Sequence, residues 1–183
     1  MIKNTKYKLN TSNLGKYQEF KEIFAKYGIE LEATHHDLRE IDADLVSVIA
    51  HKASQLEENT LVDDTSLEVE GESIGVNVRW FLDHLKDYAG RKAKCAVLLA
   101  YHKENTVFIF KGSISGIIVE SRGNNGFGFD AVFLPDGTDK TLAESKPGPF
   151  NAREKAIEAL IKGDVWAKHP LITCWDGPWQ NSF

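Results

Sequence analysis

Apolar and polar positions change their spacing several times along the chain, from the alternation typical of strands to the wider period typical of helices. Residues 7–10 fit a short strand, and residues 15–27 fit a helix with aromatic side chains on one face, ended by Gly28. Residues 29–33 alternate again, which predicts a second strand parallel to the first, reached through the helix. The N-terminal part is therefore expected to form a strand–helix–strand unit.

The middle of the chain is expected to hold one helix and two strand segments. Asp44 is a suitable N-cap for a helix that continues to about residue 57 with an apolar stripe. Residues 60–63 and 66–70 match strand segments around the acidic pair at positions 63 and 64. These two carboxylates are thus expected where one strand segment ends.

Longer elements are predicted between residues 78 and 120. Residues 78–89 predict an amphipathic helix, and residues 93–101 and 106–120 predict two long paired strands with a turn near residue 104. Strands and helices alternate throughout, so the predicted fold class is α/β with a mixed sheet.

The last predicted helix starts after Asn151 and ends at Gly163. Asn151 and Glu154 have the spacing of a capping box. Residues 164–183 form a C-terminal tail of unclear role, but its three tryptophans, Trp166, Trp175 and Trp179, indicate that it packs on the body.

Composition narrows the functional classes. The 183 residues, 42% hydrophobic and 27% charged, fit a single compact domain spanning residues 1–183. A net charge of −5 disfavours nucleic-acid polymers as partners, so a phosphate ligand would be small and held locally. No apolar stretch resembles a membrane span or a signal peptide, so we expect a cytoplasmic protein without a membrane partner. Cys95 and Cys174 lack metal-ligand spacing and are expected to be small core residues.

Residues 11–16, Thr-Ser-Asn-Leu-Gly-Lys, join the first strand to the first helix. Such a loop directs free backbone N–H groups and a positive helix end at a bound anion, and Lys16 would add a formal charge. The loop lacks the glycine spacing of a Walker loop, and turn formation alone would explain most of these residue types. Both interpretations stay open for this segment by itself.

Asp63 and Asp64 follow apolar residues, where burying an unpaired charge is unfavourable. Adjacent side chains in a strand face opposite sides, so only one of the two carboxylates is expected to face a cleft. A carboxylate there could hold a hard cation such as magnesium or accept a proton from an attacking water. A solvated turn is the alternative.

Lys52 lies one turn after Val48 and one turn before Leu56, so it points along the apolar face of its helix. A lysine in this position can bury its stem and extend its ammonium group to water, or it can reach a ligand. Spacing alone favours the first interpretation.

Residues 123–130, Gly-Asn-Asn-Gly-Phe-Gly-Phe-Asp, combine three glycines with two aromatic rings. The glycines allow close backbone folding, and the rings of Phe127 and Phe129 could stack on a base. The alternative is a hairpin loop with both phenylalanines in the core.

In this order, the segments together resemble the inosine triphosphate pyrophosphatase family over most of the chain. Residues 11–16 resemble its phosphate loop, residues 61–67 its acidic motif, residues 78–82 a segment of its eukaryotic branch, and residues 126–137 its base-side loop and strand. The resemblance implies a long curved mixed sheet with flanking helices, two lobes around a central nucleotide-binding cleft, and usually a homodimer.

The resemblance also implies an activity: hydrolysis of aberrant purine nucleoside triphosphates, such as ITP, dITP and XTP, to monophosphate and pyrophosphate, which cleanses the nucleotide pool. Magnesium is the implied cofactor. Lys16 and Lys52 would bind the phosphates and assist catalysis, and Lys52→Met is then expected to weaken triphosphate binding with little loss of stability. Glu40 and Asp64 would hold the metal, with Asp64 also placing the attacking water. The further substrate-binding positions that the resemblance implies are Thr11, Ser12, Asn13, Phe127, Phe129, Asp130, Lys146 and Arg153.

One departure from the family pattern affects the expected substrate. The Ser-His-Arg motif of the family appears here as Asn151, Ala152 and Arg153, and the preceding residues 145–150 are shortened and rich in Pro and Gly. The runner-up interpretation is therefore a related triphosphate pyrophosphatase with an altered base preference. A nucleotide-binding protein without turnover is a third, which the retention of the lysines and Asp64 argues against.

Overall fold

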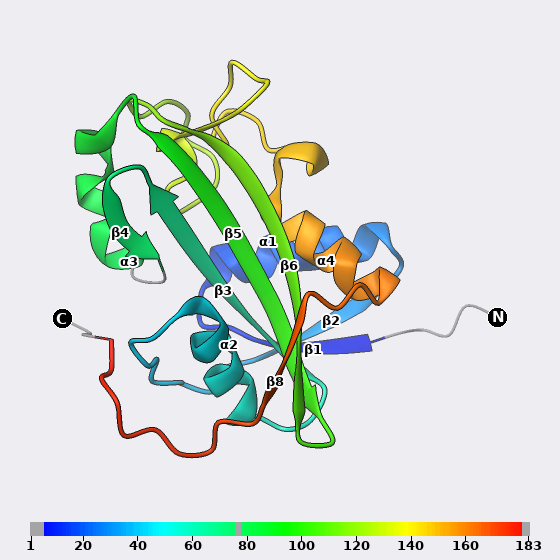
Figure 1. Cartoon of the computed structure of the whole chain (residues 1–183). Coiled ribbons are helices and arrows are strands. Elements are labelled where there is room, and N and C mark those ends of the chain that lie inside the picture. Colours follow the sequence, from blue (N-terminus) through cyan, green and yellow to red (C-terminus); the bar gives the residue numbers. More distant parts are fainter. Residues whose placement is uncertain (1–5, 76–77, 181–183) are drawn as a thin grey trace.

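The computed structural model of the chain describes residues 6–75 and 78–180 (Figure 1). The predicted N-terminal unit is confirmed: β1 (Lys6–Asn10) and β2 (Glu30–Thr34) are parallel and are joined by α1 (Leu14–Lys26). Helices often end with a left-handed residue, and Gly28 just beyond α1 has a φ of 69°.

Long antiparallel strands form the centre of a mixed sheet, and they run diagonally across Figure 1. These strands are β3 (Thr60–Val69), β5 (Lys92–Lys103) and β6 (Thr106–Ile118). The sheet has the order β2-β1-β3-β5-β6-β7, in which β7 is Phe133–Pro135. In addition, β4 (Glu72–Gly75) pairs with β3, and β8 (Ala167–Pro170) pairs with β6. The predicted α/β class with a mixed sheet is confirmed.

One edge of β3 is open along its middle. On that side β1 pairs only with Thr60 and Leu61, and β4 (Glu72–Gly75) pairs only with Leu67 and Val69. Among the described residues, no strand pairs with residues 62–66 along this edge. The prediction of two strand segments around the acidic pair was wrong, because the hydrogen bonds to β5 continue without a break from Val62 to Val69.

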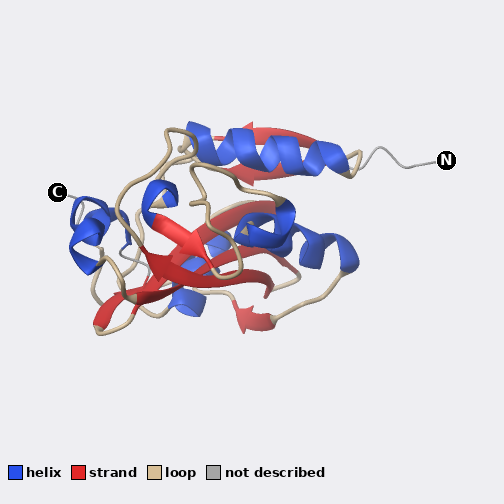
Figure 2. Ribbon diagram, turned by 90° about the horizontal axis from the view of Figure 1, so that it is seen from above, coloured by secondary structure: helices blue, strands red, loops and turns tan. Residues whose placement is uncertain are grey.

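Helices cover both faces of this sheet (Figure 2). On one face α1 and α4 (Ala152–Lys162) pack over a core that includes Leu61, Val97 and Leu99, whereas α2 (Leu45–Ser54) packs over Val62, Leu98 and Ala100 on the other. Apolar side chains at successive positions of β3 and β5 thus alternate between two cores.

Close approach fixes the position of α4. A Cβ atom added at Gly112 of β6 would collide with the backbone carbonyl oxygen of Ala152, so α4 lies against the sheet where that strand has no side chain. The side chain of Asn151 caps α4 by accepting hydrogen bonds from the N–H groups of Arg153 and Glu154. The reciprocal half of the predicted capping box was wrong, because the Glu154 carboxylate instead pairs with Lys26 of α1, 3.2 Å away.

Other element boundaries also differ from prediction. The helix expected from Asp44 to residue 57 ends at Ser54, and the helix expected over residues 78–89 is one turn of α3 (Val78–Phe81) followed by a 3-10 helix (Leu82–Tyr88). The glycine-rich loop leads through a short 3-10 helix into β7 (Phe133–Pro135).

The predicted packing of the C-terminal tail is confirmed for its described part; residues 181–183 lie outside the described residues. The tail begins as β8 (Ala167–Pro170), which is antiparallel to the start of β6, and it then crosses beneath α2 in Figure 1. Trp175 and Trp179 pack on a small core, whereas Trp166 is 47% exposed. Of the two cysteines, Cys95 is buried as predicted, but Cys174 is exposed and the prediction for it was wrong.

Candidate active site

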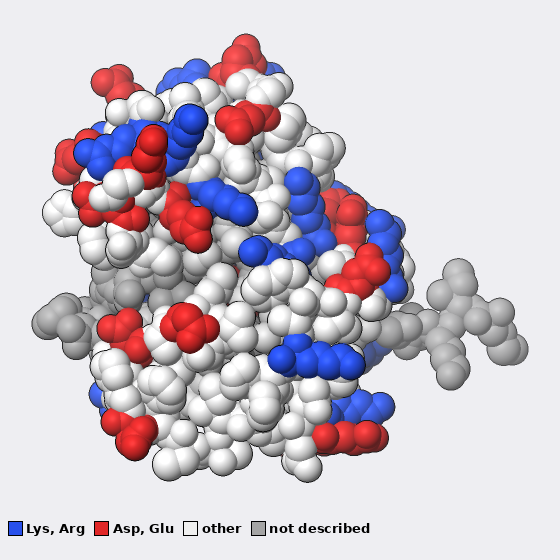
Figure 3. All heavy atoms as spheres, viewed as in Figure 1, with Lys and Arg blue, Asp and Glu red and all other residues white. Residues whose placement is uncertain are grey.

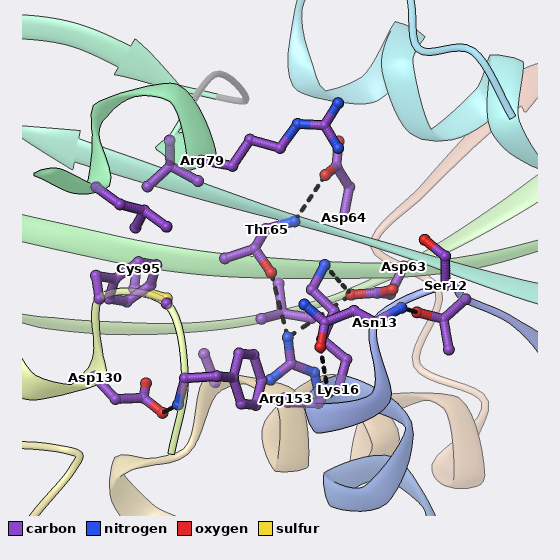
Figure 4. A pocket seen from close by; sticks show the side chains of 18 of the residues that line it. Ser12, Asn13, Lys16, Asp63, Asp64, Thr65, Arg79, Cys95, Asp130 and Arg153 are labelled. Atoms are coloured by element: carbon purple, nitrogen blue, oxygen red, sulfur yellow. Dashed lines mark hydrogen bonds and ion pairs between the residues drawn. The ribbon is translucent and has the colours of Figure 1, made fainter. Parts of the chain in front are cut away.

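A cavity of about 500 Å³ lies beside the open edge of β3 (Figure 4). Every site residue that the sequence predicted lines it; they are Thr11, Ser12, Asn13, Lys16, Glu40, Lys52, Asp64, Phe127, Phe129, Asp130, Lys146 and Arg153. Asp63 lines it as well, so the prediction that only one of the paired carboxylates faces the cleft was wrong. Their side chains still leave opposite faces of β3, but the open edge lets one cavity reach both faces.

The loop after β1 presents the N-terminus of α1 to this cavity. Asn13 caps the helix by accepting a hydrogen bond from the N–H of Lys16 at 3.0 Å, and its own N–H donates to Thr11 Oγ1 at 3.2 Å. These contacts fix the loop in a compact turn. The positive end of a helix and the Lys16 side chain therefore meet at one wall of the cavity.

Asp63 lies between two cationic side chains. Its Oδ2 atom is 3.1 Å from Lys16 Nζ and 3.7 Å from Arg153 Nη2. Burial alone would raise the pKa of this carboxyl, but the charges of Lys16, Arg153 and Lys52 lower it below its ordinary value. Asp63 is therefore an anion that holds cationic groups from α1 and α4 together.

Lys52 reaches the same region from α2. Its ammonium group donates to Glu40 Oε1 at 2.9 Å and to the backbone oxygen of Asp63 at 2.7 Å, on the open edge of β3. Burial would lower the pKa of Lys52, but the carboxylates of Asp64, Glu40 and Asp63 together raise it. The interpretation that Lys52 extends its charge to bulk water was wrong, because buried acceptors lie within its reach.

Asp64 has a carboxylate oxygen with spare hydrogen-bonding capacity. Its Oδ1 atom accepts from the N–H of Thr65 at 3.0 Å, whereas its buried Oδ2 atom has no hydrogen-bond partner among the described residues. Burial raises the pKa of Asp64 to about 6, with the negative charge of Glu40 adding to the effect and Lys52 opposing it. A buried oxygen without a partner indicates that something else binds there.

These donors fit a hard cation. Glu40 and Asp64 both present oxygen ligands to the cavity. No group of three or more metal-ligating side chains occurs in the part of the chain that the structure describes. Mg²⁺ commonly uses only one or two protein carboxylates and takes its other ligands from water and substrate phosphates. The pair would therefore hold Mg²⁺ together with a phosphorylated ligand rather than alone.

Another part of the cavity lining is aromatic and basic. The guanidinium of Arg153 lies 5.4 Å from the ring centre of Phe127, and Lys146 Nζ lies 5.1 Å from the same ring. Asp130 accepts from the N–H of Phe127 at 3.1 Å and pairs with Lys146 at 3.2 Å. Phe129, in contrast, packs on Phe133 in the core and reaches the cavity only with part of its surface. A planar ligand would meet Phe127 first.

Sequence reasoning missed Glu19, which pairs with both basic residues of this group. Its carboxylate lies 2.8 Å from Arg153 and 3.1 Å from Lys146, and it accepts from Asn151 Nδ2 at 2.8 Å. Burial opposes its ionisation, but the two cations and the Asn151 hydrogen bond lower its pKa. A spacing of one helical turn from Lys16 was the only available signal, since it places Glu19 on the same side of α1.

The sequence is similar to those of known proteins. A sequence model of the Ham1 family matches residues 8–163. The inosine triphosphate pyrophosphatase of Yarrowia lipolytica is 37% identical over 174 residues, covering 85% of this chain and 92% of that protein. The dITP/XTP pyrophosphatase of Methanopyrus kandleri is 33% identical over 182 residues, covering 87% of this chain and 94% of that protein.

The fold has a match among solved structures. The nucleoside-triphosphatase, or dITP/XTP pyrophosphatase, of Mycobacterium abscessus superposes with a TM-score of 0.57 at 22% identity, covering 85% of this chain and 97% of that one. This likeness supports the arrangement of a mixed sheet between two helical layers. The family match over residues 8–163 and the 37% identical relative show that the chain belongs to the Ham1 family.

Proposed function

We propose that this chain is a nucleoside-triphosphate pyrophosphohydrolase that converts aberrant purine nucleotides such as ITP, dITP and XTP to the monophosphate and pyrophosphate. The observation that carries the proposal is one cavity lined by two chemically different groups of residues. Lys16, Lys52, Glu40 and Asp64 form one group, and Phe127 with its basic neighbours forms the other. A nucleoside triphosphate has a matching division into polyanion and base.

The lysines and carboxylates of the cavity suit a polyanion. Lys16 and the first turn of α1 would bind phosphate oxygens, and Lys52 would approach them from α2. Glu40 and Asp64 would hold Mg²⁺, which when bound neutralises negative charge on the phosphates. With its unpaired Oδ2 atom, Asp64 would orient the attacking water and accept its proton.

The residues around Phe127 suit a purine with a 6-oxo group. The ring of Phe127 offers a stacking surface, and the amine of Lys146 offers only hydrogen-bond donors, which favours an oxygen over an amino group at that position. Arg153 is only 4% exposed on its side chain and is held by Glu19. We therefore assign it to shaping the pocket and to the positive potential around it.

Scattered surface charge supports a small ligand rather than a nucleic-acid polymer. On the face drawn in Figure 3, described Lys and Arg side chains are interspersed with Asp and Glu, and no continuous basic strip crosses it. No helix among the described residues has the length and apolar character needed to cross a bilayer. A homodimer and a cytoplasmic location stay predictions, and light scattering of the purified chain tests the first.

The test is a nucleotide panel. The purified chain is incubated with Mg²⁺ and ITP, dITP, XTP, GTP or ATP, and monophosphate, diphosphate, phosphate and pyrophosphate are separated and quantified. We expect equal amounts of monophosphate and pyrophosphate from ITP and XTP, dependent on the added metal. Release of phosphate with a diphosphate, or no turnover with any of the nucleotides, would contradict the proposal.

A further inference from the structure

The C-terminal tail contacts the chain segment that carries Glu40. The N–H of Gln180 donates to the backbone oxygen of Glu40 at 3.0 Å, and its side-chain amide donates to the oxygen of Ile41 at 3.1 Å. Pro178 accepts from the N–H of Asp42 at 3.0 Å, and Trp179 forms a bridge with Ile41. Three hydrogen bonds thus join the end of the tail to residues 40–42, and the two between backbone atoms make up the bridge.

This segment has no regular secondary structure of its own. Residues 35–40 form neither helix nor strand, and Ile41 takes part only in an isolated bridge, to Trp179. At the far end, His36 is tied to Asn10 by two hydrogen bonds, of 2.8 Å and 3.0 Å. Glu40 therefore lies on a loop that β1 holds at one end and the tail holds at the other.

Packing adds to these hydrogen bonds. Trp179 receives the guanidinium of Arg39 over its ring at 4.5 Å and meets the ring of His51 edge-on at 5.5 Å. Together with Trp175 it covers Ile41 and Val48, which are both fully buried. The ring of Trp179 thus packs between residues 39–41 and α2, the helix that carries Lys52.

Glu40 has to keep a defined position because its carboxylate already binds Lys52 at 2.9 Å inside the cavity. A shift of the loop would move that carboxylate relative to Asp64, and a cation held by two carboxylates is sensitive to their separation. The match to the Ham1 family ends at residue 163, so the clamping residues lie outside the matched region.

We propose that Trp179 and Gln180 are positioning residues for the metal site, and that the tail of this chain is a built-in clamp on Glu40. The proposal rests on the proposed function, since it takes Glu40 as a ligand of the divalent cation. Neither Trp179 nor Gln180 lines the cavity. The tail acts through the backbone of residues 40–42.

The experiment measures metal binding separately from turnover. Mn²⁺ is titrated into the purified full-length chain, and the free ion is followed by electron paramagnetic resonance, with Mg²⁺-dependent pyrophosphate release from ITP measured in parallel. Trp179→Ala and Gln180→Met are compared with the native chain, and Gln180→Met keeps the side-chain size while removing the hydrogen bond to Ile41. Trp166→Ala is the matched control, since it removes a tryptophan of the same tail whose ring faces solvent and packs near Lys111 of β6.

We expect the Kd for Mn²⁺ to rise about tenfold in both clamp variants, the usual order for losing a residue that orients a metal ligand. The Mg²⁺ concentration for half-maximal rate should rise in parallel, with kcat at saturating metal largely kept. Trp179→Phe should restore most of the affinity, and Trp166→Ala should leave it unchanged.

Two failures are distinguishable. If the native chain binds Mn²⁺ but hydrolyses no nucleotide, the proposed function fails, whereas the Mn²⁺ titration still measures the clamp. If the native chain is active and folded Gln180→Met binds Mn²⁺ with native affinity, the clamp proposal is overturned. Should Trp179→Ala fail to fold, Gln180→Met alone decides.

Discussion

Lys16 and Asp63 form an ion pair of 3.1 Å inside the cavity, with the Asp63 side chain only 4% exposed. The lysine proposed to bind phosphate is thus held in place before a substrate arrives. Asp63 also faces the buried Arg153, so the pair belongs to a larger set of compensated charges.

Removing the charge of Asp63 should therefore affect folding as well as binding. We expect Asp63→Asn to lower the free energy of unfolding by about 3 kcal/mol, the lower end for breaking a buried pair, because Lys16 can turn partly toward solvent. Urea denaturation measures this change. Glu32→Gln, which removes an exposed partner of Lys6, is the control and should leave stability unchanged. A native-like midpoint for Asp63→Asn would contradict the central role of this carboxylate.

Asp64→Asn tests the chemistry. Because the proposed role of Asp64 combines a metal ligand with placement of the attacking water, we expect turnover of ITP to fall by on the order of a hundredfold or more. Initial rates at saturating ITP and Mg²⁺ provide the measurement, and circular dichroism confirms the fold. Turnover close to native would remove Asp64 from the mechanism.

The raised pKa of Asp64 predicts a pH effect on stability in the absence of metal. The folded state holds this proton up to a pKa of about 6, whereas the unfolded chain releases it near 3.8. Stability should therefore decrease as pH rises between these values, by ~3 kcal/mol in total. In EDTA, Asp64→Asn should be more stable than the native chain by about this amount at pH 8, with the difference shrinking toward pH 4. An equal difference at both pH values would show that Asp64 ionises normally.

The contacts of Lys52 change the stability expected for Lys52→Met. The sequence suggested little loss of stability, but the ammonium group binds Glu40 and a backbone oxygen, and both acceptors would be left without it. We now expect a loss of about 2 to 3 kcal/mol together with weaker triphosphate binding. Thermal melts with and without a non-hydrolysable ITP analogue measure both effects. The exposed Lys21→Met on α1 serves as the control, and a variant with native stability would restore the earlier expectation.

Ala152 predicts a change in base selectivity. This residue lines the cavity where the family has a histidine, so one polar partner for a 6-oxo group is absent. We expect Ala152→His to raise the ratio of kcat/KM for ITP over ATP by roughly tenfold, the value of one good hydrogen bond in a buried site. Lys146→Met, which removes the amine proposed to favour the 6-oxo group, should lower the ratio. If neither variant changes it, the base is read elsewhere in the cavity.

Most of the fold could be predicted because local signals agreed with tertiary structure. The β1-α1-β2 unit, the β5–β6 pair and both ends of α4 follow from hydrophobic period, Gly28, Asn151 and Gly163. The division of residues 60–70 into two segments failed because two adjacent aspartates resemble a turn. Hydrogen bonds to β5 and cations supplied by other elements keep that strand intact.

The site was predictable to a different degree. Residue types and the family resemblance identified the cavity-lining positions, but they could not show which charges pair. Glu19 and the tail residue Gln180 were missed because their partners lie more than a hundred positions away in the chain. Spacing alone gave the wrong environment for the Lys52 ammonium group. Helical periodicity shows which face of a helix is apolar, but it does not show which hydrogen-bond acceptors of other elements lie beside that face.

The open edge of β3 sets a strict limit on how this chain can vary in length. β1 pairs with β3 at Thr60 and Leu61, and this pairing fixes which face of the strand each later side chain leaves. Asp63 therefore points toward Lys16, and Asp64 leaves the opposite face. Inserting or deleting one residue between Leu61 and Asp63 would exchange the faces of both carboxylates. Point substitutions in that stretch can be absorbed by repacking, whereas a single-residue insertion or deletion would invert the site.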